Sequence, residues 1–483
     1  MRALPVFALL LAACASPAPL VVSPSPAANP SASARPSAPV VAATAFDGAR
    51  AREHIAYLAD PARGGRYSGS AGYLDAARYV ADQLKAIGLE PLGDGGTYFQ
   101  RFTMPLVDLT ATPTLEGTGA AAKSYTHRVD FTESVSGRSG GGTAEAPIVV
   151  VGGAARTASQ NDFDGVSVKG KIALVTGPTL GNSVEAAYGE GAVGVLVTGR
   201  TEIRYSYIPK LEATTIPVLV VTDEVADELI APSGKRVSQV RDAVRARRSD
   251  PKAAAFAFDV ASPVRMSVRV TPVHEVVALN VVGLLRGSDP LASVRAVAIG
   301  GHLDGVGTDP DGTVFPAAND NASGPAIAIE VARTLAARRA ELKRSVVFIA
   351  FAGEEEGYLG SEAYVSKMAA VPGREESLVA FINLDVIGCC GSILEASNEN
   401  HDLQARVRSA AQRLGIPFNG TSAGGSDQTT FARRGIPSVL ILWNDFILHT
   451  PKDTVALIDV KRLQQAGDVV TTVALELARG DGP

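Results

Sequence analysis

Cysteine, tryptophan and basic runs are scarce in this sequence. Only three of its 483 residues are Cys, and one is Trp. So few cysteines exclude a small scaffold held together mainly by disulfides. The net charge is −5 and Lys and Arg form no long run, which argues against a nucleic acid as partner. The most basic segment, residues 241–248, is interpreted as a solvent-facing helix surface.

An apolar run long enough to cross a membrane is also missing from the N-terminus. Arg2 is followed by a short apolar run up to Ala13, which is the pattern of a secretory signal. Residues 11–14, Leu-Ala-Ala-Cys, resemble a bacterial lipobox, in which the cysteine is lipidated and becomes the mature N-terminus. An ordinary signal with a chance cysteine is the alternative. We therefore expect an exported protein, a lipoprotein of the outer membrane or periplasm anchored through Cys14, or a secreted protein.

The rest of the chain divides by composition into three parts. Residues 15–45 are mostly Ala, Pro and Ser, which predicts a disordered tether. Residues 46–108 form a first folded part, with an amphipathic helix over 70–87 that Gly88 ends. Short β-rich runs dominate residues 109–262, which we interpret as an inserted domain. Residues 263–483 continue the domain that begins at residue 46.

Strand and helix patterns alternate in this last part. Apolar runs that read as strands cover residues 276–285, 294–301, 345–353, 378–385 and 438–443. Helical patterns lie between and after them, at 323–338, 359–368, 402–414 and 460–477. Near-continuous apolar strands that alternate with helices predict an α/β fold, with a mostly parallel central sheet covered by helices on both faces.

Polar residues capable of metal or proton chemistry follow these strands. In open α/β sheets, ligands bind beyond the carboxyl ends of the strands. Side chains placed there from separate elements should therefore lie close together. The candidates are His302, Asp320, Glu354, Glu355, Asp385 and His449.

Histidines mixed with carboxylates are the ligand types of zinc. Two ions at co-catalytic distance need a carboxylate between them, and a further carboxylate must stay off the metal to accept a proton from water. Adjacent Glu354 and Glu355 suit a division into one base and one ligand. Asp304, two residues after His302, can accept the second ring N–H of that histidine and fix its tautomer.

These motifs resemble the co-catalytic di-zinc aminopeptidase family, which includes bacterial leucyl aminopeptidases and relatives of glutamate carboxypeptidase II. The resemblance covers about residues 46–109 and 276 to the end. The matching motifs are His302-x-Asp304, NDNASG around Asp320, Glu354-Glu355-x-Gly357 with Gly360-Ser361, NLDVIG around Asp385, and His449-Thr450-x-x-Asp453-Thr454. The family fold is a zinc-dependent exopeptidase fold, phosphorylase/hydrolase-like.

The resemblance implies two Zn²⁺ ions and a ligand for each position around them. Asp320 would bridge the two ions. His302 and Asp385 would complete one site, and Glu355 and His449 would complete the other.

The resemblance also implies the reaction. Glu354 would be the general base and then the acid that protonates the leaving amine, with Asp304 supporting His302. The substrate would be a peptide that loses N-terminal residues. A carboxypeptidase or dipeptidase of the same family is the alternative. A non-catalytic binding protein on this fold is the rival from another class, and the complete ligand set argues against it.

Residues 109–262 resemble a protease-associated domain, a module that gates or selects substrates in this family. Two positions depart from the family pattern: Gln428 stands where a His is common, and Leu448 where some members have a Tyr that donates to the oxyanion. Trp443, Phe446 and Phe431 could line a pocket for an apolar side chain or pack in the core.

Adjacent Cys389 and Cys390 are expected to be two buried free thiols. Because neighbouring cysteines can close only a small ring, a vicinal disulfide is the alternative, open if the protein is exported. The sequence does not indicate an oligomeric state.

Overall fold

The fold is taken from a computed structural model of the chain. It describes residues 45–118, 122–157, 160–176, 180–250, 252–370, 377–422, 424–445 and 447–480. The predicted signal and lipobox at 1–14, and the predicted tether up to residue 44, lie outside the described residues. Within the described part, no helix has the length and apolar character that a membrane crossing needs.

The larger sheet of the described residues has nine strands, in the order β1-β13-β15-β14-β16-β19-β17-β18, with β2 also paired to β13. Their bounds are β1 Glu90–Pro91, β2 Phe99–Leu106, β13 His274–Leu285, β14 Ala296–His302, β15 Ser345–Phe351, β16 Leu378–Leu384, β17 Leu394–Ala396, β18 Phe418–Gly420 and β19 Ser438–Trp443. The central strands β15, β14, β16 and β19 are parallel, as the alternating pattern predicts. On either side, β13 and β17 run antiparallel to their central neighbours, so the sheet as a whole is mixed.

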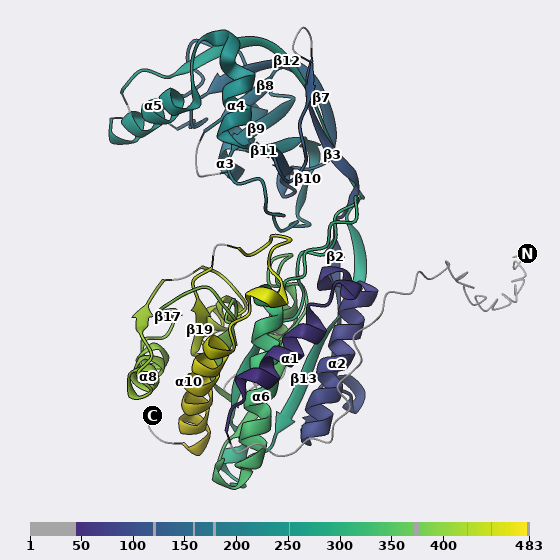
Figure 1. Ribbon diagram of the computed structural model, residues 1–483, viewed down its shortest axis with the longest axis vertical. Helices are drawn as coiled ribbons and strands as arrows, with labels where there is room; N and C mark the ends of the chain where they lie inside the picture. The colour runs from purple at the N-terminus through teal and green to yellow at the C-terminus, as the bar shows by residue number, and fades with distance from the viewer. Residues whose placement is uncertain are drawn as a thin grey trace, which may run out of the picture. The chain divides into compact units, whose positions relative to one another are not determined.

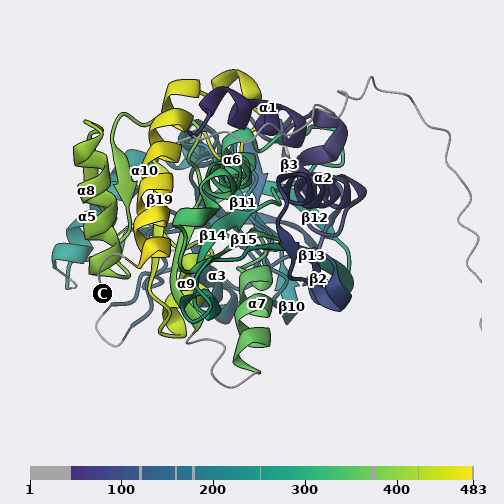
Figure 2. The same ribbon diagram turned by 90° about the horizontal axis from the view of Figure 1, so that it is seen from below.

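Helices cover both faces of this sheet (Figure 2). One core lies under α1 (Gly48–Leu58), α2 (Ala71–Ile87), α6 (Ser323–Ala337), α8 (His401–Arg413) and α10 (Val460–Arg479). The opposite core lies under α7 (Leu359–Ala369) and α9 (Gln428–Arg433). Within β14, Val297 and Ile299 belong to the first core and Ala296 and Ala298 to the second. Alternate strand residues are thus buried on both faces, which explains the continuous apolar runs.

The helix boundaries follow local capping signals. Ser70 accepts a hydrogen bond from the backbone N–H of Tyr73 at the start of α2, and Gly88 ends that helix with a φ of 91°. Glycine adopts this left-handed conformation without a steric cost, which makes it the usual stop. The predicted helix over 70–87 is therefore confirmed almost to the residue.

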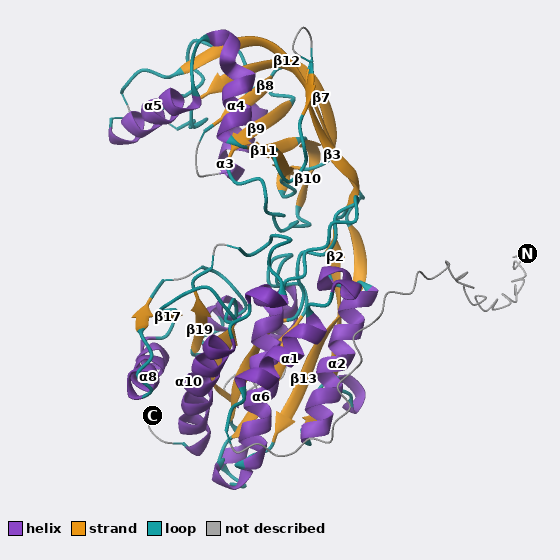
Figure 3. Cartoon of the chain, viewed as in Figure 1, coloured by secondary structure: helices purple, strands orange, loops and turns teal. Residues whose placement is uncertain are grey.

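The β-rich segment builds a second sheet, in the order β4-β3-β12-β7-β8-β9-β11-β5 (Figure 3). Its strands are β3 Leu109–Gly117, β4 Lys123–Ser124, β5 Phe131–Glu133, β7 Gly142–Val151, β8 Ile172–Val175, β9 Gly194–Thr198, β11 Val218–Val221 and β12 Ala257–Val270. The short strands β6 (Gly137–Ser139) and β10 (Leu211–Ile216) pair separately. The helices are α3 (Leu180–Gly189), α4 (Asp223–Ile230) and α5 (Val237–Ser249). This segment has its own apolar cores, the expected property of a separate domain.

The inserted domain leaves and rejoins the larger sheet at one place (Figure 1). The chain departs at the end of β2 and returns at the start of β13, where Leu106 pairs with His274. The sequence boundary at 262 falls inside β12, which continues to Val270 along β3 and β7. The inserted sheet thus extends up to the linker that precedes β13.

A disulfide joins Cys389 and Cys390, so the expectation of two free thiols is wrong. Cys390 has a φ of 74°, a left-handed conformation that a non-glycine residue rarely adopts.

Candidate metal centre

The parallel strands bring the candidate residues to one edge of the larger sheet. His302 is the last residue of β14, and Asp385 directly follows β16. Glu354 and Glu355 come shortly after β15, while His449 lies in the loop that follows β19. The sequence prediction that these separate elements meet is confirmed by the contacts among their side chains.

Asp320 lies in the turn Ala318–Ala322 that leads into α6. Asp453 fixes this turn, because its two carboxylate oxygens accept hydrogen bonds from the backbone N–H groups of Asn319 at 2.7 Å and Asp320 at 2.9 Å. Asn321 donates to the carbonyl oxygen of Leu384 at 2.9 Å, which ties the turn to the end of β16. Asp453 therefore fixes the backbone that carries Asp320.

The two oxygens of Asp320 face two different sets of side chains. Oδ1 lies 3.4 Å from Nε2 of His302, which is itself 3.2 Å from Oδ1 of Asp385. Oδ2 lies 3.1 Å from Nε2 of His449, which is 3.1 Å from Oε2 of Glu355. One carboxylate thus lies between two histidine–carboxylate pairs.

The charge balance of this cluster fits cations. Four carboxylates and only two imidazoles are gathered there, and all but Glu354 and His449 are buried. Burial alone would lower the pKa of His302, but Asp385 and Glu354 hold it well above its ordinary value. Oε1 of Glu355 is buried without a hydrogen-bond partner. Because buried charge is stable only when paired or bound to metal, these donors suit one divalent ion on each side of Asp320.

Glu354 differs from the other carboxylates in its surroundings. It lines the pocket, is only partly buried, and offers an oxygen within 4.8 Å of ligand atoms of His302 and Asp385. Desolvation raises its pKa well above the ordinary value; His302 opposes this shift, while the charges of Glu355 and Asp385 add to it. Such a raised pKa is typical of a carboxylate that exchanges protons.

Asp304 lies beside His302, but the expected hydrogen bond between them is not formed. Its Oδ1 is 3.6 Å from Nδ1 of His302, which is beyond hydrogen-bond distance. Its Oδ2 instead accepts from Ser68 Oγ at 3.1 Å and from the backbone N–H of Glu355 at 3.3 Å. Asp304 thus contacts the backbone of one candidate ligand and the ring of another.

A pocket of about 670 Å³ opens over these groups. Besides the acidic residues and His449, aliphatic side chains form much of its wall, namely Ile208, Val386, Leu440, Leu442 and Leu448. Leu448, the position where some family members have a Tyr, thus contributes an apolar surface. Trp443 and Phe431 are fully buried in the cores and do not line the pocket, while Phe446 lies outside the described residues.

Sequence reasoning did not identify several residues that line the pocket, among them Tyr358, Ser206 and Ile208. Tyr358 follows the acidic motif and lines the pocket directly. Ser206 and Ile208 come from the inserted domain, far from the motifs in sequence. The segment around them has no metal-binding or catalytic motif, so only the folded chain reveals their position.

Gln428, the other departure from the family pattern, is buried and makes hydrogen bonds to neighbouring side chains. Its Oε1 accepts from Asn383 Nδ2 at 3.0 Å and its Nε2 donates to Glu399 Oε1 at 2.9 Å. Because Asn383 is part of β16 just before Asp385, Gln428 supports the strand end instead of facing the pocket.

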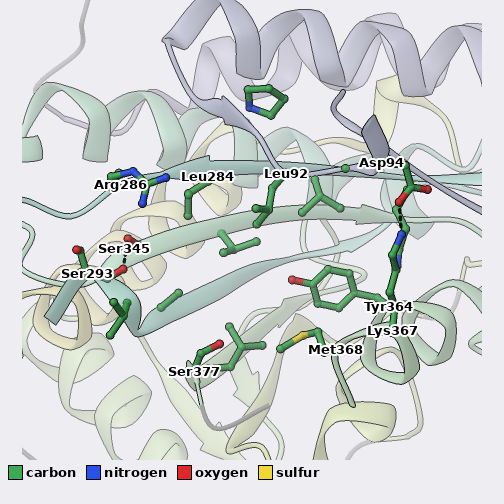
Figure 4. A pocket seen from close by; sticks show the side chains of 18 residues that line it. Leu92, Asp94, Leu284, Arg286, Ser293, Ser345, Tyr364, Lys367, Met368 and Ser377 are labelled. Atoms are coloured by element: carbon green, nitrogen blue, oxygen red, sulfur yellow. Dashed lines mark hydrogen bonds and ion pairs between the residues drawn. The ribbon is translucent and has the colours of Figure 1, made fainter. Parts of the chain in front are cut away.

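A second cavity, of about 450 Å³, lies at the opposite ends of the parallel strands (Figure 4). The first residues of β14, β15 and β16 line it, together with apolar side chains such as Leu92, Leu284 and Met368. Its charged side chains are paired: Lys367 with Asp94, and Arg286 with Glu90. The histidine–carboxylate cluster is therefore confined to the carboxyl ends of the strands.

An α/β sheet with two histidines and four carboxylates at its carboxyl edge defines the class of metallohydrolases. The comparison with protein families narrows this class to peptidases. Residues 280–474 match the model of peptidase family M28.

Curated relatives extend the similarity beyond this segment. Aminopeptidase YwaD of Bacillus subtilis (strain 168) is 26% identical over 450 residues, which cover 90% of this chain and 86% of the relative. A probable leucine aminopeptidase of Trichophyton verrucosum (strain HKI 0517) is 29% identical over 216 residues, covering 41% of this chain and 57% of that protein.

Solved structures show the same fold. An aminopeptidase from Aneurinibacillus sp. strain AM-1 has a TM-score of 0.66 at 22% identity, covering 90% of this chain and 94% of that one. BSAP, a zinc aminopeptidase from Bacillus subtilis, has a TM-score of 0.65 at 23% identity, covering 91% and 98%. Because both likenesses span nine-tenths of the chain, they include the inserted domain.

Proposed function

We propose that this protein is a zinc aminopeptidase that removes N-terminal residues from peptides through two co-catalytic ions and a glutamate base. The observation that carries the proposal is the position of Asp320, whose two oxygens face separate histidine–carboxylate pairs at the floor of an open pocket. The printed names of the relatives, which include aminopeptidases and a zinc aminopeptidase, support the same activity.

Each ligand has a place in this proposal. Asp320 would lie between the two zinc ions. His302 and Asp385 would hold one ion, and Glu355 and His449 would hold the other. When bound, zinc supplies Lewis-acid chemistry toward water and toward a peptide carbonyl.

The chain's own residues carry out the proton transfers. Glu354 accepts a proton from the attacking water while the oxygen of that water bonds to the carbonyl carbon of the scissile peptide bond. The same carboxyl then donates that proton to the nitrogen of the leaving amine as the carbon–nitrogen bond breaks. Glu354 returns to the carboxylate form, so one water is consumed and no net proton is gained by the enzyme.

The pocket wall indicates the substrate side chain. Ile208, Leu440, Leu442 and Leu448 offer an aliphatic surface next to the metal centre. Burying an apolar side chain there gains roughly 25 cal/mol per Å² of apolar area removed from water. We therefore propose a preference for peptides with a large apolar N-terminal residue, such as Leu.

The activity is tested with leucine p-nitroanilide and the purified protein. We expect hydrolysis that a strong chelator abolishes and added Zn²⁺ restores, because the metal centre supplies the Lewis acid. N-acetyl-leucine p-nitroanilide is the matched control and should remain intact. Cleavage of N-blocked peptides with a free C-terminus, but not of the free-amine substrate, would instead identify a carboxypeptidase.

Export is a separate proposal. Disulfides persist mainly outside the reducing cytosol, so the Cys389–Cys390 bond supports export. The lipid anchor at Cys14 is proposed from the lipobox pattern of residues 11–14. We further propose that the inserted domain is a protease-associated domain, on the strength of its sequence pattern and its place in the chain.

Replacing Cys14 with Ala tests the anchor. In a bacterial host that processes lipoproteins, the wild-type protein is expected in the membrane fraction and the C14A variant in the soluble fraction. Cys14 lies far outside the catalytic motifs, so specific activity on leucine p-nitroanilide should be equal. An unchanged distribution between fractions contradicts lipidation at Cys14.

A further inference from the structure

A short segment of the inserted domain, residues 203–208, reaches the metal centre. Ser206 Oγ donates a hydrogen bond to Oε2 of Glu355 at 2.8 Å. Two residues earlier, the backbone N–H of Arg204 donates to the carbonyl oxygen of His449 at 2.9 Å. Glu355 and His449 are the pair on one side of Asp320, so both of these contacts are made to the same half of the metal centre.

The inserted domain holds this segment at both ends. The carbonyl oxygen of Ile203 accepts hydrogen bonds from Arg128 Nη1 at 2.9 Å and Thr132 Oγ1 at 3.1 Å. At the other end, the backbone N–H of Ile208 donates to the carbonyl oxygen of Val135 at 3.0 Å. Ser206 is thus carried on a short stretch of chain whose two ends are tied to the inserted domain.

A buried ion network joins this stretch to the peptidase domain. The guanidinium of Arg128 donates to both oxygens of Asp309, at 2.8 and 2.9 Å, and to Oε1 of Glu133 at 2.7 Å. Arg204 lies 3.5 Å from Asp309 and over the ring of Tyr207. Asp309 belongs to the peptidase domain, while the two arginines and Glu133 belong to the insert. Bidentate, buried pairs of this kind fix geometry, because separating them would leave charges unpaired.

The other half of the metal centre is held differently. His302 contacts Asp304, Asp320 and Asp385, and the backbone N–H of Asp385 donates to the carbonyl oxygen of Ile441. All of these partners belong to the peptidase domain. The two halves therefore differ in whether the inserted domain contacts them.

We propose that Ser206 is a positioning residue for one of the two metal sites, and that the inserted domain thereby forms part of the metal centre. The hydroxyl of Ser206 orients the carboxylate of Glu355 toward the ion that Glu355 and His449 would share. The backbone N–H of Arg204 holds the loop that carries His449. Partners that orient metal ligands are worth about 10–100-fold in metal affinity. The inference rests on the proposed two-zinc function and adds that the affinity of one zinc site depends on the inserted domain.

The test is a zinc titration of the full-length, metal-free protein in competition with a chromophoric chelator. The wild-type protein should bind two ions. Ser206→Ala is expected to raise the dissociation constant of one zinc site by about 10–100-fold and to leave that of the other site unchanged. Ser206→Thr keeps the hydroxyl and should restore wild-type binding. Ser267→Ala is the matched control, because Ser267 shares a hydrogen bond with Thr143 within the inserted domain.

The outcomes separate this inference from the proposed function. If the wild-type protein binds two ions and Ser206→Ala leaves both affinities unchanged, or lowers both equally, the proposed role of Ser206 is overturned. The two-zinc function stands in that case. Fewer than two sites in the wild-type protein overturn the two-zinc proposal, and the inference with it. Thermal melting of each variant shows whether a loss of binding reflects unfolding, and a folded Ser206→Ala protein with one weakened site supports the inference.

Discussion

Glu354→Gln is expected to lower kcat on leucine p-nitroanilide by about 10²- to 10⁴-fold, the usual contribution of a general base. Gln keeps the size of the side chain but cannot accept and return a proton. Since the proposed zinc ligands are unchanged, the variant should still bind two ions, and KM should change little. The measurement is steady-state kinetics together with the zinc content of the same preparation.

Glu356→Gln is the matched control for this experiment. Glu356 is adjacent in the motif and buried, and it does not line the pocket. Burial raises the pKa of Glu356 well above its ordinary value, and Gln keeps the size and shape of its side chain. We expect kcat near the wild-type value for this variant. An unchanged kcat in Glu354→Gln would remove Glu354 from the mechanism.

Asp320→Asn is expected to abolish activity through loss of metal. Both oxygens of Asp320 face histidine nitrogens, at 3.4 Å for His302 and 3.1 Å for His449. Asn offers one oxygen and an NH₂ group that repels a cation, and it removes a negative charge from the centre of the cluster. Losing several kcal/mol of Lewis-acid stabilisation corresponds to a rate decrease of about 10³-fold or more.

Zinc content after dialysis against a weak chelator checks this prediction alongside the rate. The wild-type protein should retain two ions per chain and Asp320→Asn fewer than one. Asp311→Asn serves as the control, because Asp311 is an exposed residue of a neighbouring loop. Two tightly held ions in the Asp320→Asn protein would show that this carboxylate does not bridge the sites.

Much of this arrangement was predictable because it depends on local patterns. Buried parallel strands give continuous apolar runs, and polar residues such as His302 and Asp385 mark where those runs end. The cap at Ser70 and the stop at Gly88 define α2 through backbone chemistry that is local to a few residues. Once the strands are parallel, their ends must meet, so the cluster around Asp320 followed from the fold class.

Features that depend on long-range packing were not predictable. Ser206 is an ordinary serine in sequence, and its contact with Glu355 exists only because the ion network around Asp309 positions the insert. The antiparallel direction of β13 depends on which strands it pairs with. The apolar periodicity of its sequence does not encode that choice. The disulfide between Cys389 and Cys390 depends on the local backbone, in which Cys390 is left-handed, and the sequence left both oxidation states open.

The pairing of Leu106 with His274 makes β2 and β13 a β-hairpin whose connecting loop is an entire domain. The entropy of closing a flexible loop grows only with the logarithm of its length, by about 0.6 kcal/mol for each doubling. A chain that first folds the insert replaces that loop with a compact unit whose two ends emerge side by side. Formation of the hairpin then becomes an almost local event, and the effective contact order of the peptidase domain is much lower than its numbering suggests.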